Sequence, residues 1–184
     1  MSRPKPWRVL RTERVADCRV FEVLARHSQR PPEGLERTFF SIESPSWVNI
    51  VPRTAAGQLV MIRQFRHGKG DEVLEIPGGM IDPGEQPAQA AARELLEETG
   101  YRGRLRRIGD VNPNPALFGN RLVTFVADDC EQVAEIANDS AEETVVQLVS
   151  EAELPGLVRA GQVDHALVLS ALYWLHLDDA QRSG

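Results

Sequence analysis

The segment GGMIDPGEQPAQAAARELLEETGY, residues 78–101, places several acidic side chains on what reads as one short helix. Glu94 lies three and four residues before Glu97 and Glu98, a spacing at which like charges on a helix repel by roughly a few tenths of a kcal/mol per pair. A divalent cation would offset this repulsion, because Mg²⁺ and Mn²⁺ prefer oxygen ligands. The spacing indicates a carboxylate metal site, and the alternative is a solvated acidic face with incidental ion pairs.

The helix that carries these acids has clear boundaries in the sequence. Pro87 suits the first helical position, and Gly100 suits a left-handed stop after the last turn. At 100° per residue, the core-facing stripe is expected to hold Ala88, Ala91, Ala92, Leu95 and Thr99. By the same geometry Glu94 and Glu98 fall together at the rim of this stripe, and Glu97 lies opposite it.

Residues around the helix could complete the site. A backbone carbonyl of Gly78 or Gly79 could join the carboxylates as a metal ligand. Glu85 could approach the same cluster, and as an acid at a helix N-terminus it is also favourable in its own right. Arg93 lies one turn before Glu97, where an ion pair could orient that acid.

Composition limits the classes of function. The 184 residues fit one domain, and the net charge of −6 argues against a protein that holds nucleic acid by its phosphates. No apolar run approaches the ~20 residues of a membrane span, and the N-terminus does not resemble a signal peptide, so we expect a cytoplasmic protein. Cys18 and Cys130 are expected to stay reduced, and no Cys/His spacing indicates zinc. An anionic substrate would need local basic residues or a metal.

Strand and helix patterns predict a mixed α/β sandwich. Alternating apolar residues between Trp7 and Ser41, interrupted by RPPEG, predict a pair of antiparallel strands. Further strands are expected in WVNIVPRT, QLVMIRQFRH, LEIPGG, LVTFVADD and TVVQLVS, and further helices in EAELPGLVRAG and DHALVLSALYWLHL. The order does not match a dinucleotide-binding sheet, and PGGMIDPGE lacks the Lys-Ser/Thr of a phosphate loop.

The spacing of these residues resembles the Nudix box: Gly79 is followed by five residues and Glu85, and then by seven residues and RELLEETGY. Every fixed position of that pattern matches except the last, where Tyr101 replaces an aliphatic residue. The resemblance implies a Nudix α/β/α sandwich that hydrolyses a nucleoside diphosphate linked to another moiety, with Mg²⁺ or Mn²⁺. It implies Glu94 and Glu98 as metal ligands, and Arg93 as the residue that orients the cluster. Glu97 would be a further ligand or a supporting acid, and Gly78 would bind metal through its carbonyl.

Other stretches resemble the Nudix subgroup that cleaves ADP-ribose and related nucleoside diphosphate sugars: WVNIVP, VMIRQFRHG, LEIPGGMIDPGE, PNPA and GQVDHALVLSALYWL. Arg66 resembles a family arginine that grips the diphosphate, and Arg63 is a weaker candidate; a surface ion pair is the alternative for both. Trp47 could stack on the nucleobase or could be a core or interface residue.

The resemblance also points to a mobile loop glutamate that activates water. Glu142 and Glu143 are the candidates, and the sequence does not separate them from each other or from a solvated loop acid. His165 precedes an apolar helix, which favours a capping or packing role.

We expect residues 1–45 to form a β extension that dimerises and residues 46–184 to form the Nudix domain, giving a homodimer that binds neither nucleic acid nor membrane. Two alternatives remain. One is a Nudix pyrophosphatase for a nucleoside triphosphate, a dinucleoside polyphosphate or a coenzyme; the other is a non-catalytic nucleotide-sensing module, whose expected loss of acids is not seen here.

Overall fold

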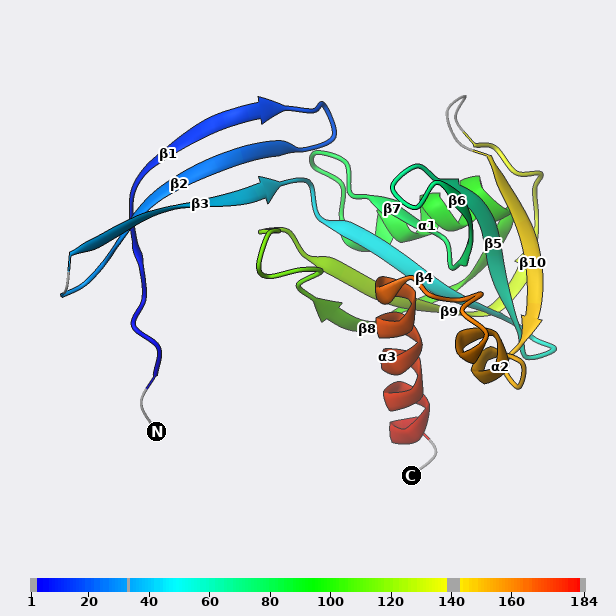
Figure 1. Cartoon of the computed structure of the whole chain (residues 1–184). Coiled ribbons are helices and arrows are strands. Elements are labelled where there is room, and N and C mark those ends of the chain that lie inside the picture. The colour runs from blue at the N-terminus through cyan, green and yellow to red at the C-terminus, as the bar shows by residue number, and fades with distance from the viewer. Residues whose placement is uncertain (1–2, 33, 139–142, 183–184) are drawn as a thin grey trace. The chain divides into compact units, whose positions relative to one another are not determined.

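The computed structural model describes residues 3–32, 34–138 and 143–182 (Figure 1). The chain divides into two compact units, Met1–Pro45 with Asn112–Arg121, and Ser46–Val111 with Leu122–Gly184. Its elements are β1 (Arg8–Asp17), β2 (Glu22–Arg30), β3 (Leu35–Glu43), β4 (Trp47–Thr54), β5 (Gln58–Arg66), β6 (Asp71–Glu75), β7 (Gly78–Met80), α1 (Pro87–Thr99), β8 (Tyr101–Val111), β9 (Leu122–Gln132), β10 (Thr144–Ser150), α2 (Leu154–Arg159) and α3 (Ala166–Arg182).

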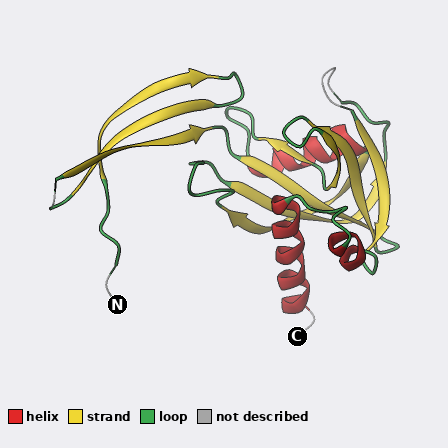
Figure 2. Cartoon of the chain, in the orientation of Figure 1, coloured by secondary structure: helices red, strands yellow, loops and turns green. Residues whose placement is uncertain are grey.

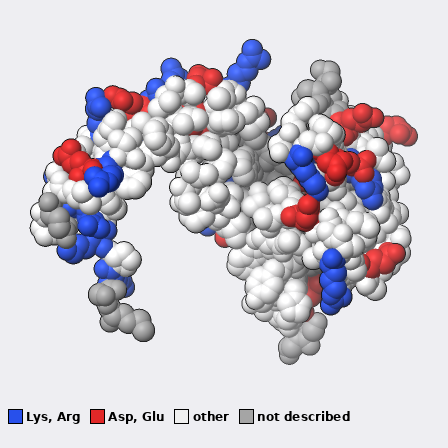
Figure 3. Space-filling view, viewed as in Figure 1, with Lys and Arg blue, Asp and Glu red and all other residues white. Residues whose placement is uncertain are grey.

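The smaller unit is a three-stranded antiparallel sheet in the order β1-β2-β3. The sequence pattern predicts β2 and β3 as a pair, and the structure adds β1 beside β2. Nearly every β1 residue is exposed, so this strand has no buried stripe to mark it. Antiparallel pairing with β2 along its length holds it instead. Exposed ion pairs lie beside this pairing, including Arg14 to Glu22 at 2.8 Å, and Figure 3 shows acidic and basic side chains interspersed over this sheet.

The larger unit is an α/β/α sandwich, which confirms the predicted fold class (Figure 2). Its sheet has the order β10-β5-β4-β9-β8, with β6 paired to β5 and β7 paired to β4. Side chains alternate across β4. Val48 and Ile50 pack with Leu95 of α1, whereas Val51 packs with Val168 and other residues of α3. The two hydrophobic clusters therefore lie on opposite faces of the sheet, one under each helix.

Strand β8 is the main element that the sequence did not predict. Its sequence, YRGRLRRIGDV, carries four arginines, and most of its residues are only partly buried. Pairing with β9 along its length supplies its backbone hydrogen bonds. The strand is thus specified by its partner more than by its own hydrophobic pattern. Among the described residues, no helix is both long and apolar enough to cross a membrane.

The two cysteines differ in a way that predicts their reactivity. Cys18 is exposed and Cys130 is buried, and neither is in a disulfide. Burial raises the pKa of the Cys130 thiol to about 11, so at pH 8 almost none of it is the reactive thiolate. We expect a chromogenic thiol reagent to modify one cysteine in the native protein and a second only after unfolding. The control Cys18→Ser should show no fast native reaction, and rapid labelling of that variant would contradict the burial of Cys130.

Candidate active site

Helix α1 forms the acidic wall of the site, and its predicted boundaries are confirmed. It starts at Pro87 and stops at Gly100, whose φ of 74° is the left-handed conformation that glycine adopts at little cost. The Gln86 backbone N–H donates to the Gln89 side chain at 2.9 Å, which satisfies one donor at the helix start.

The buried face of α1 is rotated from the predicted one. Ala88 and Ala92 are exposed, whereas Glu94 and Glu98, expected at the rim, are only 9% and 3% exposed. The reason is β7, which packs on that side of the helix and is not visible in a helical wheel.

Two backbone features of β7 allow this packing. The Gly78 N–H donates to Oε2 of Glu98 at 2.8 Å. At Gly79, a Cβ atom would lie 2.2 Å from Oε1 of Glu94, so this position has room only for glycine unless the carboxylate moves. The glycine at position 79 therefore lets β7 approach Glu94 closely, and the backbone N–H of Gly78 holds Glu98, so the strand shields both carboxylates from solvent.

Arg93 links the acids of this wall. One terminal nitrogen lies 2.8 Å from Glu94 and 3.2 Å from Glu97. Its other nitrogens bind both oxygens of Glu85 and the carbonyl of Met80. The bonds from Arg93 lower the pKa of Glu85. The ion pair predicted between Arg93 and Glu97 is present, and the same guanidinium holds two further acids in place.

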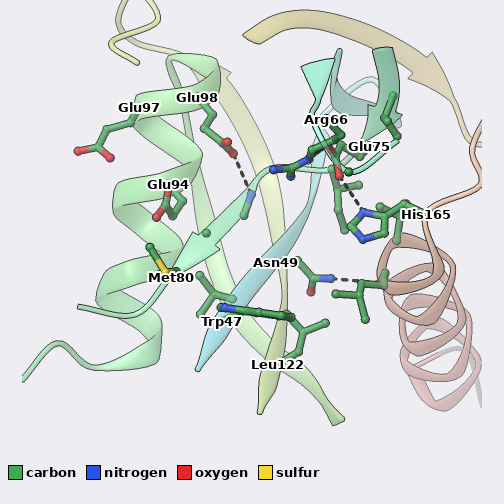
Figure 4. A pocket seen from close by; sticks show the side chains of 18 of the residues that line it. Trp47, Asn49, Arg66, Glu75, Met80, Glu94, Glu97, Glu98, Leu122 and His165 are labelled. Atoms are coloured by element: carbon green, nitrogen blue, oxygen red, sulfur yellow. Dashed lines mark hydrogen bonds and ion pairs between the residues drawn. The ribbon is translucent and has the colours of Figure 1, made fainter. Parts of the chain in front are cut away.

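A cavity of about 910 Å³ opens beside α1, β4, β6 and the start of α3 (Figure 4). Among the described residues that line it, six acids outnumber three bases: Glu75, Asp82, Glu94, Glu97, Glu98 and Asp164 against Arg66, Lys69 and Arg93. A diphosphate entering this cavity would meet net negative charge. Cations bound with the substrate would remove that repulsion.

The chemistry of the donors fits a divalent metal. Glu94 and Glu98 supply carboxylate oxygens, which Mg²⁺ and Mn²⁺ favour, and both line the cavity. In the described part of the chain, no three acidic, histidine or cysteine side chains surround one point that could hold an ion. Arg93 occupies part of the acids' hydrogen-bonding capacity, so a metal would compete with this guanidinium for Glu94.

A second charged group lies across the cavity from the acids (Figure 4). Glu75 is 1% exposed and accepts from Arg66 Nε at 2.6 Å, while its other oxygen lies 2.8 Å from Nδ1 of His165. Burial by itself would raise the pKa of Glu75, but the hydrogen bonds from His165 and Arg66 outweigh burial and lower it. The cavity thus holds an arginine fixed by a buried carboxylate.

Neither Glu75 nor His165 was predicted as a site residue from the sequence. The available signal was an acid inside the otherwise apolar strand segment VLEIP, because such an acid is buried only with a partner. His165 does occupy the expected helix-start position, since its carbonyl accepts from Val168 N–H. Its side chain, however, lines the cavity and contacts Glu75.

The remaining predicted residues fall in different places. Trp47 and Arg66 line the cavity with the α1 acids, whereas Arg63, Glu85 and Glu143 are not among its described lining residues. The Arg63 guanidinium donates a hydrogen bond to the Gln147 side chain at 2.7 Å and forms an ion pair with Glu72 at 2.6 Å. Glu143 is exposed, and Glu142 lies outside the described residues. The roles assigned to these residues stay predictions.

Comparisons with known proteins agree with this geometry. Residues 44–172 match the family model described as the NUDIX domain. The ADP-ribose pyrophosphatase of Bacillus subtilis is 31% identical over 153 residues, which cover 81% of this chain and 82% of that protein. The ADP-ribose pyrophosphatase of Mycobacterium tuberculosis is 27% identical over 157 residues, 83% of this chain and 75% of that one.

A solved structure of an ADP compounds hydrolase superposes with a TM-score of 0.86 and 25% identity, covering 99% of this chain and 98% of that chain. The family model spans most of the chain. It includes helix α1, the two glycines of β7 and Arg66 of the cavity. Nudix hydrolases generally use divalent metal ions, which suits the donors found here. This chain therefore belongs to the Nudix family and is a Nudix pyrophosphohydrolase.

Proposed function

We propose that the protein hydrolyses the diphosphate linkage of ADP-ribose or a related nucleoside diphosphate sugar, with Mg²⁺ or Mn²⁺, to give a nucleoside monophosphate and a sugar phosphate. The observation that carries this is the pairing, in one cavity, of the buried carboxylates Glu94 and Glu98 with the anchored Arg66. Divalent metals and guanidinium groups both bind and neutralise phosphate oxygens. The names of the B. subtilis and M. tuberculosis relatives support the choice of substrate.

The residues of α1 and β7 would bind the metal and orient its ligands. Glu94 and Glu98 would hold the metal, with Glu97 and the Gly78 carbonyl as further ligands. When bound, the metal neutralises the diphosphate and lowers the pKa of the attacking water. Arg93 holds Glu94 and Glu97 in place, and it ties Glu85 to them.

On the opposite wall, Arg66 would bind phosphate oxygens through its planar guanidinium. Glu75 keeps this guanidinium in position by its Nε, and thus reduces the entropy lost on binding. A loop acid, Glu142 or Glu143, would take the proton of the water. Breaking one P–O bond of the linkage and adding water across it yields the two monophosphates.

We also propose that the protein is a cytoplasmic homodimer. The smaller unit exposes large apolar side chains on β1 and β3, namely Val9, Leu10, Val15, Phe39 and Phe40. Exposed apolar groups of this number on a small sheet favour burial against a second copy. Sedimentation equilibrium should give twice the 20.5 kDa chain mass, and a monomer at micromolar concentration would contradict the dimer.

Metal removal and product analysis test the proposed reaction. With Mg²⁺, ADP-ribose should yield AMP and ribose phosphate, and EDTA should reduce the rate by at least about 10²-fold, because the charge of the transition state is then uncompensated. Calorimetry without substrate should detect Mg²⁺ or Mn²⁺ uptake. Release of pyrophosphate from nucleoside triphosphates in preference to AMP from ADP-ribose would favour the first alternative. Nucleotide binding without turnover would favour a sensing module.

A further inference from the structure

Asn49 of β4 carries a buried side-chain amide whose nitrogen is hydrogen-bonded and whose oxygen, within the described part of the chain, is not. Only 6% of the residue is exposed, and its Nδ2 donates to the Leu167 carbonyl at 3.2 Å near the start of α3 (Figure 4). Its Oδ1 has no hydrogen-bond partner among the described residues. Reversing the amide would bring two oxygens together at Leu167, so the bond to Leu167 fixes Oδ1 as an acceptor.

An unsatisfied buried acceptor is costly, and in a native protein it calls for an explanation. Asn49 lines the cavity, so a molecule bound there lies beside this residue and is a candidate source of the missing donor. Its register neighbour on β9, Thr124, offers a contrast: the Thr124 hydroxyl is also buried and unpartnered among the described residues, but Thr124 is not one of the described lining residues. The position of Asn49, and not burial alone, connects its acceptor to a ligand.

The surface beside this acceptor suits a flat ring. Trp47 precedes Asn49 by two residues on β4, so both side chains project from the same face of the sheet. Leu122 is the register partner of Trp47 on β9. Trp47, Asn49 and Leu122 all line the cavity. An aromatic side chain and an aliphatic one next to a single fixed acceptor match a heterocycle that carries an amino group.

We propose that this surface binds the nucleobase of the substrate and that Asn49 Oδ1 accepts a hydrogen bond from an amino group of that base, as on adenine. Asn49 is then a specificity-determining residue. It selects bases with an amino donor over bases that present only hydrogen or a carbonyl at that position. This inference rests on the proposed function, because it concerns the nucleoside half of the same substrate.

The test compares two nucleotides that differ only in the amino group. Calorimetry on the full chain should show AMP binding roughly 3- to 10-fold more tightly than purine riboside 5′-monophosphate, which lacks the 6-amino group. This first comparison uses the wild-type protein and does not depend on a variant that folds. Asn49→Ala should bring the ratio of the two affinities close to one.

A further variant controls for the effect of burial alone. Thr124→Val removes the neighbouring unpartnered hydroxyl with little change of shape, and it should leave the ratio unchanged.

The inference is overturned if the wild-type protein binds both nucleotides with equal affinity, or if Asn49→Ala leaves the ratio of the two affinities unchanged. It is also overturned if Asn49→Ala binds ribose 5-phosphate more weakly than the wild-type protein does, because that result would assign the acceptor to a sugar hydroxyl. Turnover of ADP-ribose without any preference for AMP removes this subsite and keeps the proposed function. A preference for AMP without turnover of any nucleoside diphosphate sugar keeps this subsite and removes the proposed function.

Discussion

Replacing Glu98 by glutamine is expected to lower turnover of ADP-ribose by about 10²- to 10³-fold while the protein stays folded. Glu98 is 3% exposed and lines the cavity. Glutamine keeps the oxygen that accepts from the Gly78 N–H, so the contact between β7 and α1 survives. The carboxylate charge that would bind the metal is lost, and the measurement is kcat together with Mg²⁺ affinity by calorimetry.

Two glutamates serve as controls for this variant. Glu97 is on the same helix, but its side chain is 44% exposed and its ion pair is with Arg93, so Glu97→Gln should reduce turnover less. Glu131, an exposed acid of β9 outside the described cavity lining, should tolerate the same change without effect. If Glu98→Gln retains turnover within twofold of the wild-type value at unchanged melting temperature, Glu98 has no part in the mechanism.

Glu75→Gln is expected to destabilise the protein by about 3 kcal/mol at pH 7 and to raise KM for ADP-ribose. The buried carboxylate holds Arg66 and His165 with its two separate oxygens. A neutral amide offers one acceptor in place of two and turns its own N–H groups toward one of these partners. Urea denaturation measures the loss of stability, and a KM increase larger than any kcat decrease would identify Glu75 as a positioning residue for Arg66.

The same strand offers a matched control. Glu72 of β6 pairs with Arg63 at 2.6 Å, the distance of the Glu75 pair with Arg66, but the Glu72 side chain is 56% exposed. Exposed pairs contribute only about 0–1 kcal/mol, so Glu72→Gln should have little effect. Equal losses of stability in the two variants would show that burial of Glu75 does not matter.

Acidification should reduce the difference between wild type and Glu75→Gln. The pKa of Glu75 is lower in the folded protein than its ordinary value of 4.5, so the unfolded chain takes up a proton first as the pH falls. The stabilisation by Glu75 is complete above about pH 4.5 and is lost as the pH falls through the folded-state pKa. Urea denaturation from pH 7 to pH 3 checks this, and a constant difference over that range would contradict the lowered pKa.

Local patterns in the sequence determined much of this protein. Pro87 and Gly100 gave both ends of α1, and the strand segments WVNIVPRT and TVVQLVS match β4 and β10. These features depend on neighbouring residues in the chain, where fixed φ angles and alternating burial act directly. Spacing also put Glu94 and Glu98 on one side of the helix, as 3.6 residues per turn requires.

Only the tertiary structure decided how deeply those acids are buried and what surrounds them. A helical wheel cannot show that β7 packs on Glu94 and Glu98, because the contact depends on a strand pairing with β4. Glu75 and His165 are 90 residues apart in the chain, and Asn49 and Leu167 are 118 apart. Partners at such separations are set by how the sheet and α3 pack, since the chain between them leaves no local pattern. The acidic wall of the site was therefore readable from the sequence, whereas on the opposite wall only Arg66 and Trp47 were predicted, and their partners were not.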